Sequence, residues 1–108
     1  MKILIIGTTA YQMKMRVHAL ALADKGHICK LPAFDFFSGT EIQMCTHNKE
    51  LILWADEVHV LWDGRSTGTI FDLGMCFALN KKIKTIYLEK KNFVNLLKQM
   101  VDNNAEDK

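Results

Sequence analysis

Apolar residues follow two alternating periods along the chain. Short continuous apolar runs, such as residues 2–7, are typical of buried strands, whereas apolar residues three or four positions apart, such as Met13, Val17 and Leu20, are typical of helices. The alternation predicts strands at residues 2–7, 27–31, 57–62 and 83–88, and helices at about residues 11–25, 41–55, 69–80 and 91–102.

Apolar positions also indicate which helix faces are buried. The expected inward residues of the second helix are Cys45, Leu51, Ile52 and Ala55, and the last helix is marked by Phe93, Leu96, Leu97, Met100 and Val101. Residues 33–40 show no period and are predicted to form a loop. Three aromatic residues in this loop are candidates for one wall of a ligand pocket or for a subunit contact: Phe34, Phe36 and Phe37.

Strands that are apolar throughout and alternate with helices predict a parallel sheet covered by helices on both faces. We therefore expect an α/β fold, a single-domain Rossmann-like or flavodoxin-like three-layer sandwich with four parallel strands in the order 2-1-3-4. The domain is expected over residues 1–102, followed by a polar tail at 103–108. A chain of 108 residues has room for one such core.

Composition narrows the classes of partner. The chain is 49% hydrophobic and 24% charged, and its net charge of +2 comes from scattered side chains, so neither nucleic acid nor an anionic membrane is an expected partner. No apolar segment reaches the roughly 18 residues that span a bilayer, and the first strand follows Met1 too closely for a signal peptide. A cytoplasmic location is expected.

Cysteine and histidine spacings argue against a metal site. The three cysteines, Cys29, Cys45 and Cys76, are an odd number without a Cys-x-x-Cys pair, which argues against a disulfide framework and a zinc site and favours reduced thiols. The histidines also lack a metal-binding spacing and are expected to be packed or surface residues: His18, His27, His47 and His59. No metal and no cofactor are expected.

The loop at residues 62–69 is the main candidate site. It leaves a buried strand and enters a helix, and at such a place free backbone N–H groups and the positive end of the helix dipole bind phosphate. The sheet order brings it beside residues 7–11, so both segments are expected to line one crevice for a nucleotide or sugar phosphate. The loop reads Trp62-Asp63-Gly64-Arg65-Ser66-Thr67-Gly68-Thr69.

Each loop residue has a ligand role and a structural alternative. Gly64 and Gly68 either allow close approach of the backbone to a ligand or provide unusual dihedral angles for the turn. Arg65 adds positive charge near a phosphate. Asp63 either bonds a ribose hydroxyl or base edge, or begins an Asx turn.

Asp72 also has two interpretations. Thr69-Ile70-Phe71-Asp72 has the form of a capping box, with Thr69 as the N-cap and Asp72 as its acidic partner. The alternative is direct contact between Asp72 and a ligand, and one residue can fill both roles. Trp54 and Trp62 are expected in the core or at its rim, where Trp62 is a candidate border of a nucleobase pocket.

Several short motifs occur together between residues 55 and 83. They are Ala55-Asp56-x-Val58, Ser66-x-Gly68, Asp72-Leu73-Gly74 and Ala78-x-Asn80-Lys81. This stretch resembles the nucleoside 2-deoxyribosyltransferase family and its relatives that hydrolyse deoxynucleoside monophosphates. A turn at Gly7 and the Gly26-His27 pair fit the same layout, so the resemblance covers most of the chain. The loop is also similar to the nucleotide-binding loop of the SLOG superfamily, a Rossmann-like group with binding and sensing domains.

The resemblance implies specific roles. Asp72 occupies the position of the family's Glu nucleophile, which attacks the anomeric carbon, but it is one methylene shorter and reaches about 1.5 Å less far. Ser66 matches a serine that contacts the 5′-phosphate in the monophosphate-hydrolysing relatives, and Tyr11 matches a tyrosine that orients the nucleophile or sugar, although packing in the core is its alternative. The family's second acid would fall near Asn48 or Glu50, and Asn48 cannot act as an acid.

Two functions follow from these observations. The first is cleavage or transfer at the N-glycosidic bond of a nucleoside, deoxynucleoside or 5′-monophosphate by Asp72, with Gly7, Thr69 and the other loop residues binding the substrate. The second is non-catalytic sensing of a nucleotide or ADP-ribose-like ligand in the same loop. In both, the partner is a small molecule. Because the sites of the resembling family lie at oligomer interfaces, we expect a homodimer or a higher homo-oligomer.

Overall fold

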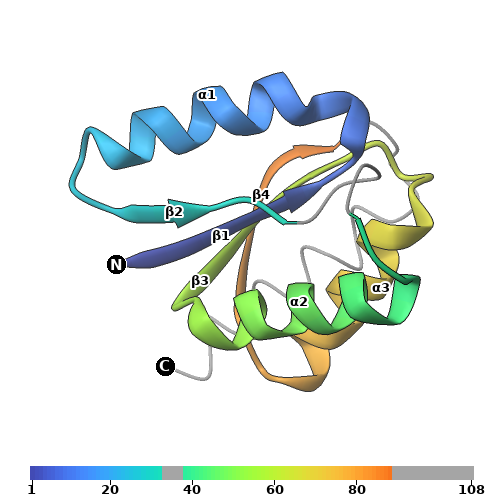
Figure 1. Cartoon of the computed structure of the whole chain (residues 1–108). Coiled ribbons are helices and arrows are strands. Elements are labelled where there is room, and N and C mark those ends of the chain that lie inside the picture. The colour runs from blue at the N-terminus through green and yellow to red at the C-terminus, as the bar shows by residue number, and fades with distance from the viewer. Residues whose placement is uncertain (33–37, 89–108) are drawn as a thin grey trace.

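The computed structural model describes residues 1–32 and 38–88. Within these ranges, strands and helices alternate (Figure 1). The elements are β1 (Lys2–Gly7), a 3₁₀ turn (Thr9–Tyr11), α1 (Gln12–Ala23), β2 (Ile28–Lys30), α2 (Glu41–Trp54), β3 (Glu57–Trp62), α3 (Thr67–Ala78) and β4 (Lys82–Leu88). These bounds lie within two residues of the predicted ones, and α3 begins two residues early.

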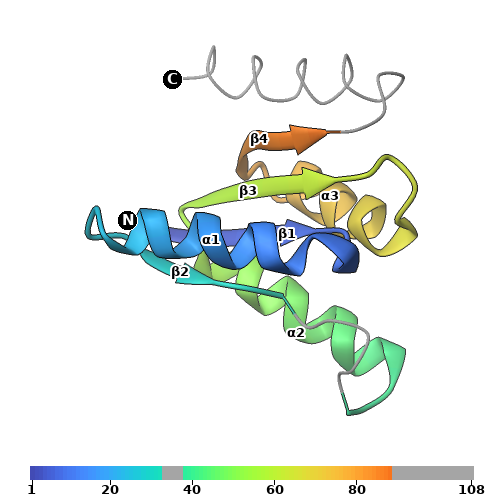
Figure 2. The same ribbon diagram turned by 90° about the horizontal axis from the view of Figure 1, so that it is seen from above.

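The four strands form one parallel sheet in the order β2-β1-β3-β4, as predicted. Helix α1 lies over one face, while α2 and α3 lie over the other, which confirms the α/β sandwich (Figures 1 and 2). The order places the switch point between β1 and β3, where the chain leaves the sheet toward opposite faces. The loops after these two strands are therefore neighbours.

Two apolar clusters separate the layers. The larger joins the sheet to α2 and α3 and contains Leu51, Ile52 and Ala55, which were predicted to face inward. The smaller lies under α1 and includes Met15 and alternate residues of β1. All six residues of β3 are buried, so the strand that carries the candidate loop is the best covered in the sheet.

The three apolar residues whose spacing predicted α1 do not face the sheet. Met13, Val17 and Leu20 are exposed, with 72%, 60% and 67% of their surfaces accessible, and Met15 is the residue buried against the sheet. Ala19 and Leu22 are partly buried against the same cluster as Met15. Met13 and Val17 instead border a shallow hollow beside Leu61 of β3 and Tyr87 of β4.

Three expectations lie outside the described residues: the aromatic wall at 34, 36 and 37, the helix at 91–102 and the tail at 103–108. In the described ranges, no helix combines the length and the apolar character needed to cross a bilayer.

Candidate functional site

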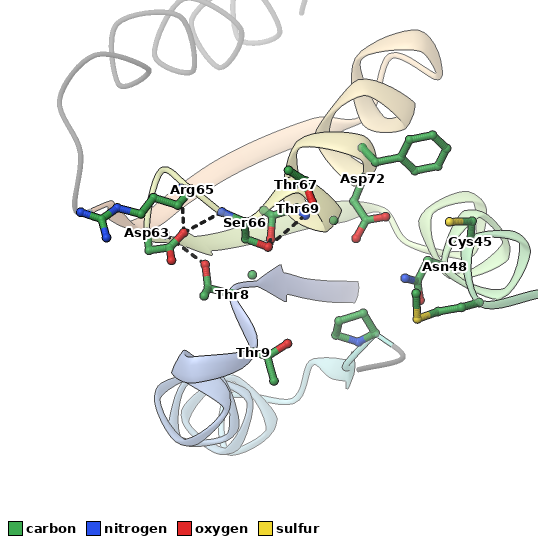
Figure 3. A pocket seen from close by; sticks show the side chains of 15 residues that line it. Thr8, Thr9, Cys45, Asn48, Asp63, Arg65, Ser66, Thr67, Thr69 and Asp72 are labelled. Atoms are coloured by element: carbon green, nitrogen blue, oxygen red, sulfur yellow. Dashed lines mark hydrogen bonds between the residues drawn. The ribbon is translucent and has the colours of Figure 1, made fainter. Parts of the chain in front are cut away.

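A pocket of about 480 Å³ opens at the carboxyl ends of β1 and β3 (Figure 3). The turn after β1, the loop after β3 and the first turns of α3 form most of its wall, and α2 closes one side. This volume is within the range of small-molecule sites. Two loops that are far apart in the sequence meet here, as expected from the order of the strands.

Asp63 folds the loop after β3 into a tight turn. Its carboxylate Oδ1 accepts hydrogen bonds from the backbone N–H groups of Arg65 at 2.8 Å and Ser66 at 2.9 Å. Desolvation opposes ionisation, but these bonds and that with the Thr8 hydroxyl outweigh it and hold the pKa of Asp63 below its usual value. Asp63 thus forms the Asx turn that was one of its two interpretations.

Ser66 begins α3. Its hydroxyl oxygen accepts hydrogen bonds from the backbone N–H of Thr69 at 3.4 Å and from the Thr69 hydroxyl at 3.2 Å. Since Ser66 is the N-cap, Thr69 is the third residue of the helix, and the predicted capping box of Thr69 and Asp72 is wrong. The turn made by Asp63 is the cause, because it ends the loop at Ser66 and starts the helix early.

Asp72 faces the pocket from the second turn of α3 (Figure 3). Only 8% of its surface is exposed, and no hydrogen bond to its carboxyl is found among the described residues. Burial raises the pKa of Asp72 to about 7. A buried carboxyl with a raised pKa on a pocket wall is a candidate functional group.

Asn48 lies on α2 across the pocket from Asp72 (Figure 3). It is buried, whereas Glu50 is exposed and lies outside the pocket wall. Of the two residues considered for the second acid, Asn48 lines the pocket and Glu50 does not. Nearby, Met44 and Phe71 also line the pocket, and sequence reasoning missed both. For Phe71 the available signal was its adjacency to Asp72, and for Met44 the sequence carried none.

The three candidate glycines differ in their surroundings. Gly7 lines the pocket, and a Cβ there would collide with the backbone carbonyl of Leu61, so close packing of β1 against β3 requires glycine. Gly64 has φ +79° and provides the turn, but it is not part of the pocket wall. Gly68 lines the wall inside α3, where a Cβ would meet open space.

Tyr11 and Trp62 point away from the pocket wall. The Tyr11 ring packs edge-on against Tyr87 under the α1 side of the sheet, with centroids 5.2 Å apart. Trp62 is buried in the α2–α3 cluster, and its Nε1–H donates to the Ser66 carbonyl at 3.1 Å. Both Tyr11 and Trp62 therefore pack against other residues, which was the alternative to a ligand contact. By contrast, Arg65 is exposed at the rim of the pocket.

Metal binding finds no support in the described ranges. No group of three or more His, Cys, Asp or Glu side chains is arranged there to hold an ion. The cysteines are free thiols, and burial raises the pKa of Cys76 to about 12, with the charge of Asp72 adding to the effect. The pocket therefore offers hydrogen-bond donors, a helix N-terminus and one reactive carboxyl.

Comparison with known proteins supports the fold. No family model matches the sequence, and a comparison with curated proteins finds no match. Among solved structures, the chain is similar to a Clostridium botulinum CMP N-glycosidase, BcmB, with a TM-score of 0.65 and 20% sequence identity. The match covers 90% of this chain and 79% of that protein. At this identity the similarity establishes a shared Rossmann-like architecture.

Proposed function

We propose that the pocket binds a nucleoside or its 5′-monophosphate and that Asp72 cleaves the N-glycosidic bond. The supporting observation is the buried, unpartnered Asp72 carboxyl on the wall of a pocket that also contains the α3 N-terminus. The resemblance to nucleoside 2-deoxyribosyltransferases and the fold shared with BcmB point to the same chemistry.

In the proposed reaction, an Asp72 carboxylate oxygen bonds to the anomeric carbon as the carbon–nitrogen bond breaks. The base leaves with the electron pair and takes a proton from water. A water molecule, or a second base in a transfer reaction, then attacks the same carbon and releases Asp72, as in retaining glycosidases. With a pKa of about 7, Asp72 is ionised in about half of the molecules at neutral pH.

The ligand's phosphate is assigned to the loop. Ser66 and the N–H groups at the start of α3 would donate hydrogen bonds, and Arg65 at the rim would add charge. Asp63 would act on the ligand only indirectly, since its Oδ1 already holds the turn. Its second carboxylate oxygen is the remaining candidate for a ribose hydroxyl.

Non-catalytic nucleotide sensing is the second candidate. Two observations favour it: the nucleophile position holds the shorter Asp72, and the side chain opposite is Asn48, which cannot protonate a leaving base. Loss of general acid catalysis costs about 100-fold to 10,000-fold in rate.

One assay separates the two. Purified protein is incubated with a panel of deoxynucleosides, ribonucleosides and their 5′-monophosphates, and free base is measured by chromatography. We expect release by the wild type, loss in Asp72→Asn, and a gain of about 100-fold in Asp72→Glu, since the longer side chain restores the reach. The exposed acid Asp24 provides the matched control, Asp24→Asn. Ligand binding without base release from any panel member would favour sensing.

We also propose that the protein is a homodimer in the cytoplasm. Ile42 and Phe71 are exposed and border an apolar hollow between α2 and α3, beside the pocket. Paired copies would cover this surface, and free thiols suit a reducing compartment. Sedimentation analysis at several concentrations tests the assembly, and a monomer throughout would exclude it.

A further inference from the structure

A chain of three titratable side chains lies on the α1 face of the sheet, where the proposed reaction does not use it. Nε2 of His18, on α1, lies 2.8 Å from Nδ1 of His59, on the central strand β3. Nε2 of His59 in turn lies 3.0 Å from Oε1 of Glu57. His59 and Glu57 are buried, with 3% and 6% of their surfaces exposed, while His18 is half-buried.

When both rings are neutral, the hydrogen bonds among His18, His59 and Glu57 determine which ring nitrogen carries each proton. The Glu57 carboxylate only accepts, so His59 carries its proton on Nε2 and leaves Nδ1 as an acceptor. His18 must then donate from its own Nε2. The pair can take up one extra proton, because Nδ1 of His18 is free of this contact and can bind it. A second proton would have to bind Nδ1 of His59, and its N–H would then face the N–H of His18 Nε2 across 2.8 Å.

Charges around the pair oppose double protonation. Lys84 on β4 and Lys25 after α1 act on His18, and Lys84 acts on His59. Glu57 is the opposing charge, and Lys82 lies 4.0 Å from its other oxygen. Burial has the larger part in lowering the pKa of His18, and the two lysines add to it. Burial also lowers the pKa of His59, although the hydrogen bond with Glu57 and the charge of Glu57 act in the opposite direction. β1 contributes Ile3 and Ile5 to the packing here. Met1 and His27 line a hollow together with Glu57 and His59, and Nδ1 of His27 lies 3.1 Å from the Met1 amino nitrogen.

The contact matters because it is a polar link between the middle of α1 and the central strand, beside the apolar contacts that Met15, Ala19 and Leu22 make with the sheet. Met15 is the one fully buried side chain of α1 among the described residues, and the apolar residues at 13, 17 and 20 are exposed. The segment that leads into α1 contains Thr8 and Thr9, which line the ligand pocket. Thr9 lies within the short turn that leads directly into α1, so the position of α1 bears on this part of the pocket wall.

We propose that the His18–His59 contact is a pH-sensitive latch, which holds α1 on the sheet until both rings are protonated and then releases α1 together with the Thr9 side of the pocket. The inference does not depend on the proposed function, because any ligand of the pocket would respond to it.

Amide hydrogen exchange of the full chain tests the latch between pH 7.5 and 5, after correction for intrinsic exchange rates. We expect the opening of α1, relative to β1, to increase by up to about tenfold per pH unit for each proton taken up below pH 6.5. His18→Gln keeps a donor to His59 but cannot be charged, so only His59 can still take up a proton, and the dependence should fall to at most about tenfold per pH unit in total, against up to about a hundredfold for two protons in the wild type. His47→Gln, an exposed position on α2, is the control and should behave as the wild type. Equal pH dependence in His18→Gln and wild type would overturn the latch.

An NMR titration of the wild-type imidazoles gives a second test that needs no variant. Coupled rings are expected to titrate in two separated steps that both His18 and His59 report. Two independent single steps at the usual histidine pKa would contradict the proposal.

Discussion

Thr8 and Asp63 lie 55 positions apart in the sequence and are joined by a hydrogen bond, in which the Asp63 backbone N–H donates to Thr8 Oγ1 at 3.0 Å. The Thr8 backbone N–H also donates to the Leu61 carbonyl at 3.0 Å. These two bonds fasten the turn after β1 to the end of β3 and to the loop that follows it. The two segments that line the pocket are therefore tied directly to each other.

This tie predicts the effect of changing Thr8. Thr8→Val keeps the shape but removes the acceptor, so a part-buried N–H loses its partner and the free energy of unfolding falls by about 1–2 kcal/mol. Urea unfolding measures the loss, and exchange of the Asp63 amide should become faster. Thr8→Ser retains the oxygen and should restore both values. Unchanged exchange in Thr8→Val would show that the bond does not hold the loop.

Gly7 and Gly74 should respond oppositely to alanine. At Gly7 a Cβ meets the Leu61 carbonyl, which the sheet holds in place, so Gly7→Ala should lower the free energy of unfolding by about 1–3 kcal/mol. At Gly74, on an exposed part of α3, a Cβ meets open space, and alanine should raise it by about 0.5–1 kcal/mol. Denaturant unfolding of both variants checks the pair. A stable Gly7→Ala would refute the close-packing explanation.

Asp72 makes stability depend on pH. Its pKa rises from 3.8 in the unfolded chain to about 7 in the folded one, so its contribution is full below pH 4 and is lost as pH rises through 7. Asp72→Asn, which cannot ionise, should match the wild type near pH 4 and exceed it by on the order of 2–4 kcal/mol at pH 8. Unfolding curves of both proteins across this range give the difference. A constant difference would mean that Asp72 is not buried as described.

Ser66 offers a way to separate capping from phosphate binding. Ser66→Ala removes the N-cap and should cost about 1 kcal/mol of stability. Ser66→Asp preserves a good N-cap but places a negative charge where the phosphate is assigned. We expect near wild-type melting, together with at least tenfold weaker binding of a 5′-monophosphate and little change for the nucleoside. Equal loss for both ligands would place the phosphate elsewhere.

The sequence by itself determined the elements, their order and the region of the site, because these depend on local periodicity. Apolar runs specified the strands, and alternation with helices left few sheet orders. The loop from Trp62 to Thr69 was found for the same reason, since a polar segment between a buried strand and a helix is visible in one stretch of chain. The predicted elements that fall within residues 1–32 and 38–88 agree with the structure to within two residues.

Only the tertiary structure decided what individual side chains do, because those properties depend on contacts between distant residues. Asp63 was equally consistent with a ligand contact and an Asx turn until its distances were known. The burial that raises the pKa of Asp72 comes from the packing of α3 against its neighbours, and Asn48 reaches the site only because α2 closes the pocket. Likewise, no periodicity joins His18 to His59, since 41 positions separate two rings that the sheet and α1 bring into contact.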